Sequence, residues 1–240
     1  MPITDKLALS RRRLGKAGAA LALVAVLPPG RRAASAAGAP PAPLHLTGAP
    51  ARVPMVGEGH PETVVWAYDG SVPGPVLRVR QGTQFRAVLE NGLSENTTVH
   101  WHGIRLPTAM DGVPVLTQPP IRPGGSFTYA FTPPDAGTFL YHSHDDSLVQ
   151  MGRGLAGALI VEEPEPPPMD RELIWVIQDW RLTGDAQIEP HFATRMQEAM
   201  SGRIGNTVTI NGQVPDAVRV RAGSACGCAS SMPRRRASCG

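Results

Sequence analysis

Apolar and polar residues alternate in short segments from about residue 62 onward, and turn-forming residues separate these segments. The clearest segment is Ser126–Phe131, in which aromatic residues occupy every second position. This alternation predicts an antiparallel strand with one buried face and one solvated face. Asp69-Gly70, Pro73-Gly74 and Asn91-Gly92 are dipeptides typical of the turns between such strands.

Seven segments of this part have the length and composition of strands, and they recur about every ten residues. Short strands at this spacing predict an all-β fold over residues 62–163, in the form of a Greek-key sandwich or barrel. The predicted strands are Thr63–Tyr68, Val76–Val79, Gln84–Glu90, Thr97–Trp101, Ser126–Phe131, Thr138–His142 and Ala158–Glu162.

A second set of strand-like segments follows an acidic, proline-rich stretch at residues 164–169, which we expect to be an extended linker. Residues 170–222 are expected to begin a second β domain, because their segments repeat the strand and turn pattern. The expected elements are strands at Ile174–Trp180, Thr207–Ile210 and Ala217–Val220, a turn at Asn211-Gly212 and a short helix over residues 190–203.

Residues 1–38 have the organisation of an export signal. Basic residues precede an apolar run from Ala17 to Leu27, and Ala34-Ser35-Ala36 offers a cleavage site. Eleven helical residues span about 16 Å, which is short of the ~30 Å hydrocarbon core, so we expect no membrane anchor. Ser10–Lys16 resembles the twin-arginine consensus, which implies the twin-arginine export machinery as a partner. A general secretory signal is the alternative, and either implies a bacterial periplasmic or extracellular location.

The net charge of +3 is not spread evenly along the 240 residues. Arg11–Arg13 and Arg234–Arg236 lie near the two ends, and the middle of the chain is close to neutral. The charge distribution therefore gives no reason to expect a nucleic-acid partner. Residues 39–61 follow the export signal and are rich in proline, alanine and glycine at their start, so we expect a flexible leader there.

Four of the seven histidines form two His-x-His pairs, His100 with His102 and His142 with His144. Residues i and i+2 of a strand share one face, so two adjacent strands would direct four imidazoles to one region. Neutral imidazole is a ligand for copper, zinc, iron or nickel. Structural zinc sites usually add cysteine, so copper is favoured over zinc. Chance, or a satisfied polar residue in the core, is the alternative for a single pair.

The sequence around both pairs resembles the multicopper oxidases, the laccase-like family. The similarity is dense over residues 62–163 and thinner over residues 170–222. It implies a cupredoxin fold, with a complete first domain and the start of a second. The motifs that carry it are His100-Trp101-His102-Gly103, Tyr141-His142-Ser143-His144, Met110–Pro114, Thr117–Ile121 and Gly152–Val161.

The resemblance also implies copper as cofactor and roles for single residues. His100 resembles a type 2 copper ligand, His102 and His142 resemble ligands of one type 3 copper, and His144 resembles a ligand of the other. Asp111 resembles the acidic residue that assists proton delivery to reduced oxygen, a task suited to a carboxylate. An ordinary Asp-Gly turn is the alternative for Asp111. The partners implied are O2 and a reducing substrate, which the sequence does not identify.

The same resemblance implies eight histidines around three coppers and a His-Cys-His stretch for a type 1 copper. This sequence holds four of those histidines and no His-Cys-His stretch. We therefore expect a chain that carries half of the trinuclear site and is inactive alone. A non-enzymatic copper-binding or scaffolding protein is one alternative. A small two-domain copper enzyme is another, although it needs a type 1 cysteine.

All three cysteines lie in residues 223–240, a segment with neither alternation nor an apolar face. Reading the gene one base earlier converts each cysteine codon into one for Leu, Val or Met. It also restores apolar residues at positions 226, 228 and 230, provided that Ser230 has a TCx codon. We therefore expect residues 223–240 to be an out-of-frame tail of a longer oxidase. Cys226 and Cys228 are not expected to form a metal site.

Overall fold

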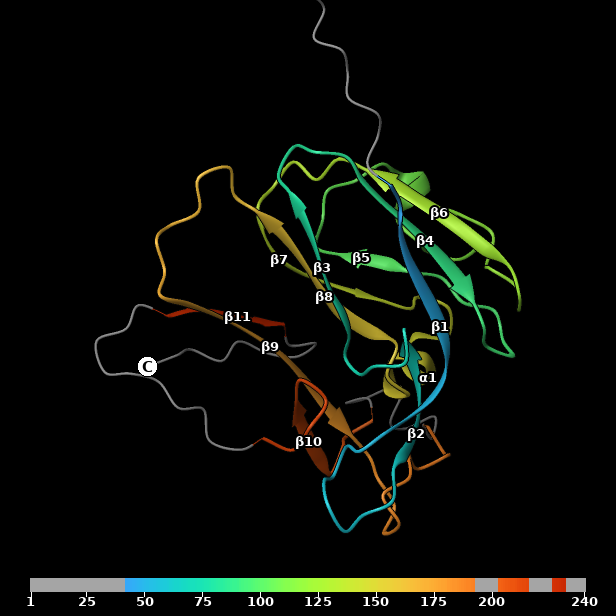
Figure 1. Cartoon of the computed structure of the whole chain (residues 1–240). Helices are drawn as coiled ribbons and strands as arrows, with labels where there is room; N and C mark the ends of the chain where they lie inside the picture. Colours follow the sequence, from blue (N-terminus) through green and yellow to red (C-terminus); the bar gives the residue numbers. More distant parts are fainter. Residues whose placement is uncertain (1–41, 193–202, 216–225, 232–240) are drawn as a thin grey trace, which may run out of the picture. The chain divides into compact units, whose positions relative to one another are not determined.

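The computed structural model describes residues 42–192 and 203–215 together with the backbone of residues 226–231. This part of the chain is built from eleven strands with two short helical elements, η1 (Thr108–Met110) and α1 (Ser147–Gly152). Figure 1 shows how the strands are arranged. The predicted all-β fold class is therefore confirmed. The predicted export signal, most of the predicted helix at 190–203 and the predicted strand at 217–220 lie outside the described residues.

Two four-stranded sheets form the part that carries both histidine pairs. Their strands are β1 (Leu44–Val53), β2 (Thr63–Tyr68), β3 (Gly74–Arg80), β4 (Phe85–Asn91), β5 (His100–His102), β6 (Ser126–Phe131), β7 (Gly137–His142) and β8 (Ala156–Glu162). One sheet has the order β2-β1-β4-β6 and the other has the order β3-β8-β7-β5. Pairs β1/β4 and β3/β8 are parallel, and the other neighbours are antiparallel. The chain thus crosses between sheets, as the predicted Greek-key arrangement requires.

The inward-facing side chains of these strands form one hydrophobic core. On β6, Tyr129 and Phe131 are buried while the intervening residues are more exposed, as the alternation predicts. Trp101 of β5 is 1% exposed, and its ring lies edge-on to Phe85, Tyr129 and Phe131 at centroid distances of 5.0–5.4 Å. Edge-to-face aromatic pairs add to the free energy gained by burial. The core therefore anchors the strand that carries the first histidine pair.

The prediction of a flexible leader at residues 39–61 is wrong, because β1 lies within this range. Its first half pairs with β4 and its second half with β2, and the two pairings meet at Gly48. Pro50 falls in the half with a single neighbouring strand, where the missing N–H is tolerated. Leu46 is buried in the core. The proline and alanine content of the segment concealed a strand that is stabilised by its distant partners.

A third sheet follows the linker. Its central strand is β9 (Arg171–Trp180), which lies between β10 (Thr207–Ile210) and β11 (Cys226–Ser231). The predicted strands at 174–180 and 207–210 are therefore present. The segment predicted to be an out-of-frame tail contains β11, which pairs in parallel with β9 and covers positions 226, 228 and 230. Strand pairing uses backbone groups, which are the same whichever side chains the gene encodes. The pairing of β11 therefore does not test whether residues 223–240 are out of frame, and this stays a prediction.

A second hydrophobic cluster joins the end of β9 to β2. Trp180 is 1% exposed and belongs to this cluster. Hydrogen bonds reinforce the contact, since Thr63 Oγ1 donates to the Ala186 carbonyl at 2.8 Å. The other buried members of the cluster are Met55, Val65, Ala67, Val72 and Leu182. Residues 180–188 are therefore tied to β2 by burial and by hydrogen bonding.

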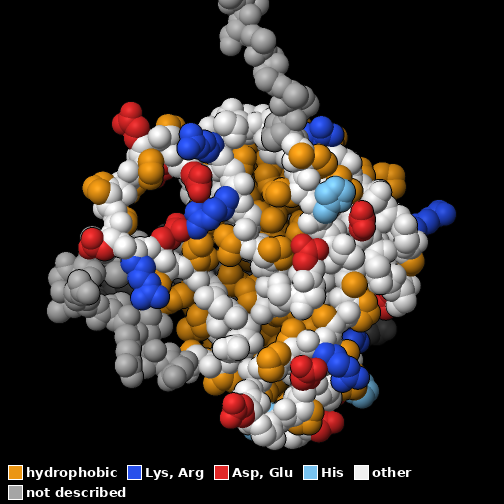
Figure 2. All heavy atoms as spheres, viewed as in Figure 1, with side chains coloured by type: hydrophobic (Ala, Val, Ile, Leu, Met, Phe, Trp, Pro, Cys, Tyr) orange, Lys and Arg blue, Asp and Glu red, His pale blue; other side chains and the backbone are white. Residues whose placement is uncertain are grey.

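Basic and acidic side chains are interspersed on the face of the molecule drawn in Figure 2. That face does not present a basic patch of the kind that attracts nucleic acid. The expected absence of a nucleic-acid partner stays a prediction. Within the described ranges, no helix has both the length and the apolar character needed to cross a membrane.

Candidate metal centre

Strands β5 and β7 bring the two histidine pairs together. They pair antiparallel, with His100 opposite His142 and Trp101 opposite Tyr141. Trp101 and Tyr141 point into the core, where they are 1% and 0% exposed. The histidines occupy the alternate positions of both strands and so lie on the opposite face. The pairing of β5 with β7 therefore brings the predicted ligands side by side, as expected from the two-residue spacing within each histidine pair.

The four imidazole rings form one cluster around His100. Its ring centroid lies 5.5 Å from that of His102, 5.3 Å from that of His142 and 5.1 Å from that of His144. The rings of His142 and His144 are 6.2 Å apart. His144 lies just beyond the end of β7, so the strand pairing alone does not fix its position.

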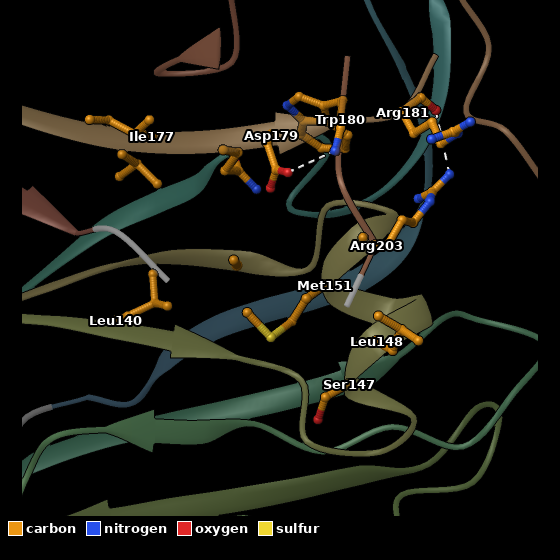
Figure 3. Close-up of a pocket in the computed structure, with 14 residues that line it drawn as sticks. Leu140, Ser147, Leu148, Met151, Ile177, Asp179, Trp180, Arg181 and Arg203 are labelled. Carbon is orange, nitrogen blue, oxygen red and sulfur yellow. Dashed lines mark hydrogen bonds between the residues drawn. The ribbon is translucent and has the colours of Figure 1, made fainter. Parts of the chain in front are cut away.

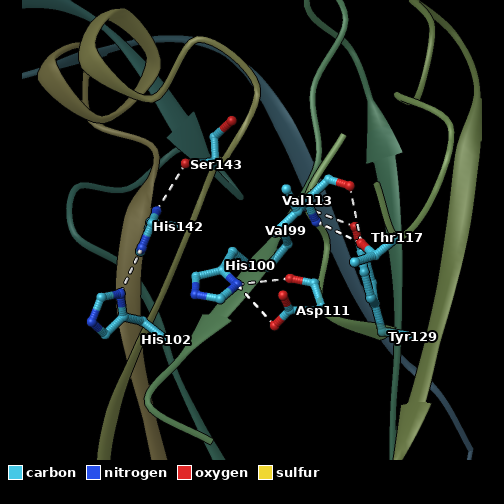
Figure 4. Close-up of polar contacts among 9 residues, drawn as sticks. All are labelled: Val99, His100, His102, Asp111, Val113, Thr117, Tyr129, His142 and Ser143. Carbon is cyan, nitrogen blue, oxygen red and sulfur yellow. Dashed lines mark hydrogen bonds and ion pairs between the residues drawn. The ribbon is translucent and has the colours of Figure 1, made fainter. Parts of the chain in front are cut away.

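The nitrogen atoms of three of these histidines are close enough to share metal ions. The ligand atoms of His100, His102 and His142 all lie within 4.8 Å of one another. His142 Nε2 and His102 Nδ1, drawn in Figure 4, are 3.4 Å apart. Metal–nitrogen distances in zinc sites are about 2.0–2.1 Å, so two nitrogens on one ion lie at most about 4.2 Å apart. The His102–His142 spacing therefore fits a single ion between the two strands.

The His100 ring is oriented by Asp111. Its Nδ1 lies 2.7 Å from the Asp111 carbonyl oxygen and 3.2 Å from the carboxylate Oδ1 (Figure 4). Nδ1–H donates to the carbonyl, which leaves the lone pair on Nε2 for a metal. Hydrogen bonds of this kind fix the tautomer and increase the basicity of a ligating imidazole. Asp111 thus contacts the cluster, and its backbone makes the shorter contact.

Gly112 allows the Asp111 segment to approach β5. Its φ of +76° is in the left-handed region, and a Cβ there would lie 1.8 Å from the Val99 carbonyl oxygen. Only glycine meets both conditions without displacing the backbone. The Asp-Gly pair is therefore both a turn and the means by which Asp111 reaches His100.

The His142 ring is held in its neutral form. It is 6% exposed, and its Nδ1–H donates to the Ser143 carbonyl at 2.8 Å. Burial, together with charge repulsion from the other three histidines, lowers the pKa of His142 to about 4, although the hydrogen bond to the Ser143 carbonyl acts in the opposite direction. Metals bind the neutral imidazole, so the environment favours the ligating form. His102 is exposed, which leaves a route for an ion from solvent.

Sequence reasoning did not identify a buried polar group beside the cluster. Ser143, Gln150 and Thr97 are each at most 1% exposed and are hydrogen-bonded to one another. The position of Ser143 between two histidines indicates that it faces away from them. A glutamine seven residues downstream gave no comparable signal, because its partners are distant in sequence.

A separate cavity of about 260 Å³ lies between α1 and β9. Figure 3 shows Met151 pointing into it. Met151 is half-buried, and the charged lining residues are Asp179, Arg181 and Arg203. None of the four clustered histidines lines this cavity. The candidate metal centre therefore lies elsewhere.

Comparisons with known proteins identify the family. A sequence model described as multicopper oxidase matches residues 51–166. Copper resistance protein A of Escherichia coli is 44% identical over 114 residues, which are 47% of this chain and 18% of that protein. Laccase-1 of Cryptococcus neoformans var. neoformans serotype D is 39% identical over 164 residues, which are 63% of this chain and 26% of that protein. The chain thus spans between 18% and 26% of these relatives.

A solved structure gives the same result. The crystal structure of a multi-copper oxidase from Pseudomonas thermotolerans matches with a TM-score of 0.68 and 42% sequence identity, covering 72% of this chain and 42% of that one. Proteins of this family use copper, and the range matched by the family model includes both histidine pairs. Residues 51–166 of this chain therefore form a cupredoxin domain of the multicopper oxidase family.

Proposed function

We propose that this chain binds copper through His100, His102, His142 and His144, and that it supplies half of the trinuclear copper site of a multicopper oxidase. The observation that carries the proposal is the convergence of the two histidine pairs on one face of β5 and β7. Imidazole nitrogens are suitable ligands for copper, and two of them already have the spacing that one ion requires.

The individual roles follow the resemblance to the family. His100 is the proposed type 2 ligand, His102 and His142 hold one type 3 copper, and His144 holds the other. When bound in the complete site, copper supplies the one-electron oxidation of a reducing substrate and the four-electron reduction of O2 to water. The Asp111 carboxylate lies beside His100, where it would take up a proton from solvent and, as the carboxylic acid, pass it on to reduced oxygen.

We further propose that the protein is exported by the twin-arginine machinery to the periplasm or the outside of a bacterial cell. The basic residues and apolar run of residues 1–38 support this proposal. The relatives named copper resistance protein A favour a role in copper handling, and those named laccase favour an oxidase.

A copper titration of the purified chain tests the proposed function. We expect copper to remain bound after dialysis, at one ion or more per chain, as measured by atomic absorption. His45→Ala and His191→Ala serve as controls, because these histidines are exposed and pair with Glu90 and Glu189 and not with the cluster. A chain that retains no copper, or a control variant that loses it, would place the function elsewhere.

Oxidase activity is expected to be absent from the 240-residue chain alone. It supplies four of the eight histidines implied by the family and has no His-Cys-His stretch for electron entry. Oxygen uptake with a phenol or Cu(I) as reductant should equal that of free copper at the same concentration. Uptake above that level would contradict the half-site proposal and favour an enzyme. Copper binding without uptake is also what the non-enzymatic alternative predicts.

The Asp111→Asn variant is expected to bind as much copper as the wild type. The carbonyl of residue 111 makes the shorter contact with His100, so the imidazole keeps its orientation when the carboxylate becomes an amide. A partly exposed polar contact of this kind contributes 0 to about 1 kcal/mol, so the copper affinity should fall by less than about fivefold. Loss of copper from this variant would show that the carboxylate itself is a ligand.

A further inference from the structure

We infer that Gln150 is the positioning residue that fixes the two histidine pairs relative to each other. The inference rests on the proposed copper function, but Gln150 is not itself a proposed ligand. It lies in α1, after the second pair in sequence, and is 1% exposed. Its effect on the metal centre would be transmitted through the segments that it contacts.

The side-chain amide of Gln150 joins the segments that carry the two pairs. Its Oε1 accepts hydrogen bonds from Thr97 Oγ1 at 2.8 Å and from Ser143 Oγ at 2.5 Å. Its Nε2 donates to the Asn96 carbonyl at 2.7 Å. An amide oxygen has two lone pairs, and both are used here. Asn96 and Thr97 shortly precede the first pair, and Ser143 lies inside the second.

The backbone of the same residue strengthens this connection. The Gln150 carbonyl accepts a hydrogen bond from Leu155 N at 3.0 Å, and the Leu155 carbonyl accepts one from Ser143 N at 3.2 Å. Ser143 is therefore held from both its side chain and its backbone. These contacts close a ring of hydrogen bonds between α1, the start of β8 and the second histidine pair.

The metal centre needs such a connection because the strand pairing beside it is short. β5 contains three residues, and three residue pairs join it to β7. His144 lies beyond the end of β7, so its place depends on the conformation of Ser143. A buried amide left without partners loses its hydration and gains no hydrogen bond in return, which opposes any separation of the three segments. Gln150 thus holds the site in the arrangement that metal binding requires.

The Gln150→Leu variant tests this role, because leucine has a similar volume and makes no hydrogen bonds. We expect the copper affinity to fall by about 10- to 100-fold, the range found when partners that orient metal ligands are removed. The electron paramagnetic resonance spectrum of bound Cu(II) should also change. In the metal-free protein, the imidazole ¹⁵N resonances of His142 and His144 should shift, because these rings change position. The last readout does not require copper.

Gln178→Leu is the matched control. Gln178 is also a buried glutamine, at 9% exposed, but it lies on β9 and lines the separate cavity. This control should keep the copper affinity, the Cu(II) spectrum and the imidazole resonances of the wild type. A Gln150→Leu protein that is folded and matches the wild type in all three measurements would overturn the inference.

Ser143→Ala is a second, milder variant that keeps the test decisive if Gln150→Leu does not fold. It removes the hydrogen bond that Ser143 donates to Gln150. The bond that Thr97 donates to Gln150 and the bond that Gln150 donates to the Asn96 carbonyl both remain. We expect a smaller loss of copper affinity and smaller shifts of the imidazole ¹⁵N resonances than in Gln150→Leu. A Ser143→Ala protein without these changes would overturn the inference. If the wild type itself binds no copper, the proposed function fails, whereas the imidazole resonances still decide the role of Gln150.

Discussion

The His102→Ala/His142→Ala double variant is expected to lose copper binding altogether. The two changes remove one imidazole from each pair, and they remove the two nitrogens that lie 3.4 Å apart. His100 and His144 remain, with their ring centroids 5.1 Å apart, but neither retains its partner from the same pair. Copper per chain after dialysis, measured by atomic absorption, should therefore fall to the background level.

The matched control for this loss is the His45→Ala/His191→Ala double variant. Its two histidines have side chains that are 64% and 92% exposed, so their removal alters neither the core nor the cluster. It should bind the same amount of copper as the wild type. Circular dichroism should show the same β content in both double variants. Unchanged copper content in the His102→Ala/His142→Ala protein would refute the ligand assignment.

The Gly112→Ala variant is expected to lose both stability and copper affinity. A φ of +76° costs an L-residue about 1–2 kcal/mol. The new Cβ would also lie 1.8 Å from the Val99 carbonyl oxygen, and a clash with backbone is not relieved by rotating a side chain. Overpacking of this kind costs a further 1–3 kcal/mol or so. The free energy of unfolding in urea should therefore fall by about 2–5 kcal/mol.

Gly124→Ala separates the clash from the backbone conformation. Gly124 has a φ of +73°, close to that of Gly112, but no atom lies within 4 Å of the added Cβ. It should lose only the conformational part, about 1–2 kcal/mol, and should keep the copper affinity of the wild type. Equal stability and equal copper affinity in the two alanine variants would show that the approach of Gly112 to Val99 is not needed.

Local patterns predicted much of the fold and the centre of the site. The strands at Thr63–Tyr68, Ser126–Phe131 and Thr207–Ile210 have the predicted bounds, because each is a short β-rich segment ended by turn residues. The face shared by His100 and His102 follows from the two-residue period of a strand. These features depend on neighbours in sequence, which a single sequence displays.

The features that were missed depend on contacts between distant residues. Strand β1 is stabilised by pairing with β2 and β4, which outweighs the composition that predicted a leader. The backbone carbonyl of Asp111 orients His100. Every residue type has such a carbonyl, so the identity of the side chain at position 111 does not predict this contact. Gln150 contacts Thr97 across 53 residues of sequence. Only the folded chain brings these groups together.

The most direct test of the copper site is pulsed electron paramagnetic resonance on the chain loaded with one Cu(II) ion. Nitrogen modulation from the remote nitrogen of a coordinated imidazole reports how many histidines bind the metal. We predict coordination by at least two imidazoles in the wild type, and its loss in the His102→Ala/His142→Ala variant. A spectrum without imidazole modulation, or one that is identical in the two proteins, would contradict the assignment of the histidine cluster as a copper site.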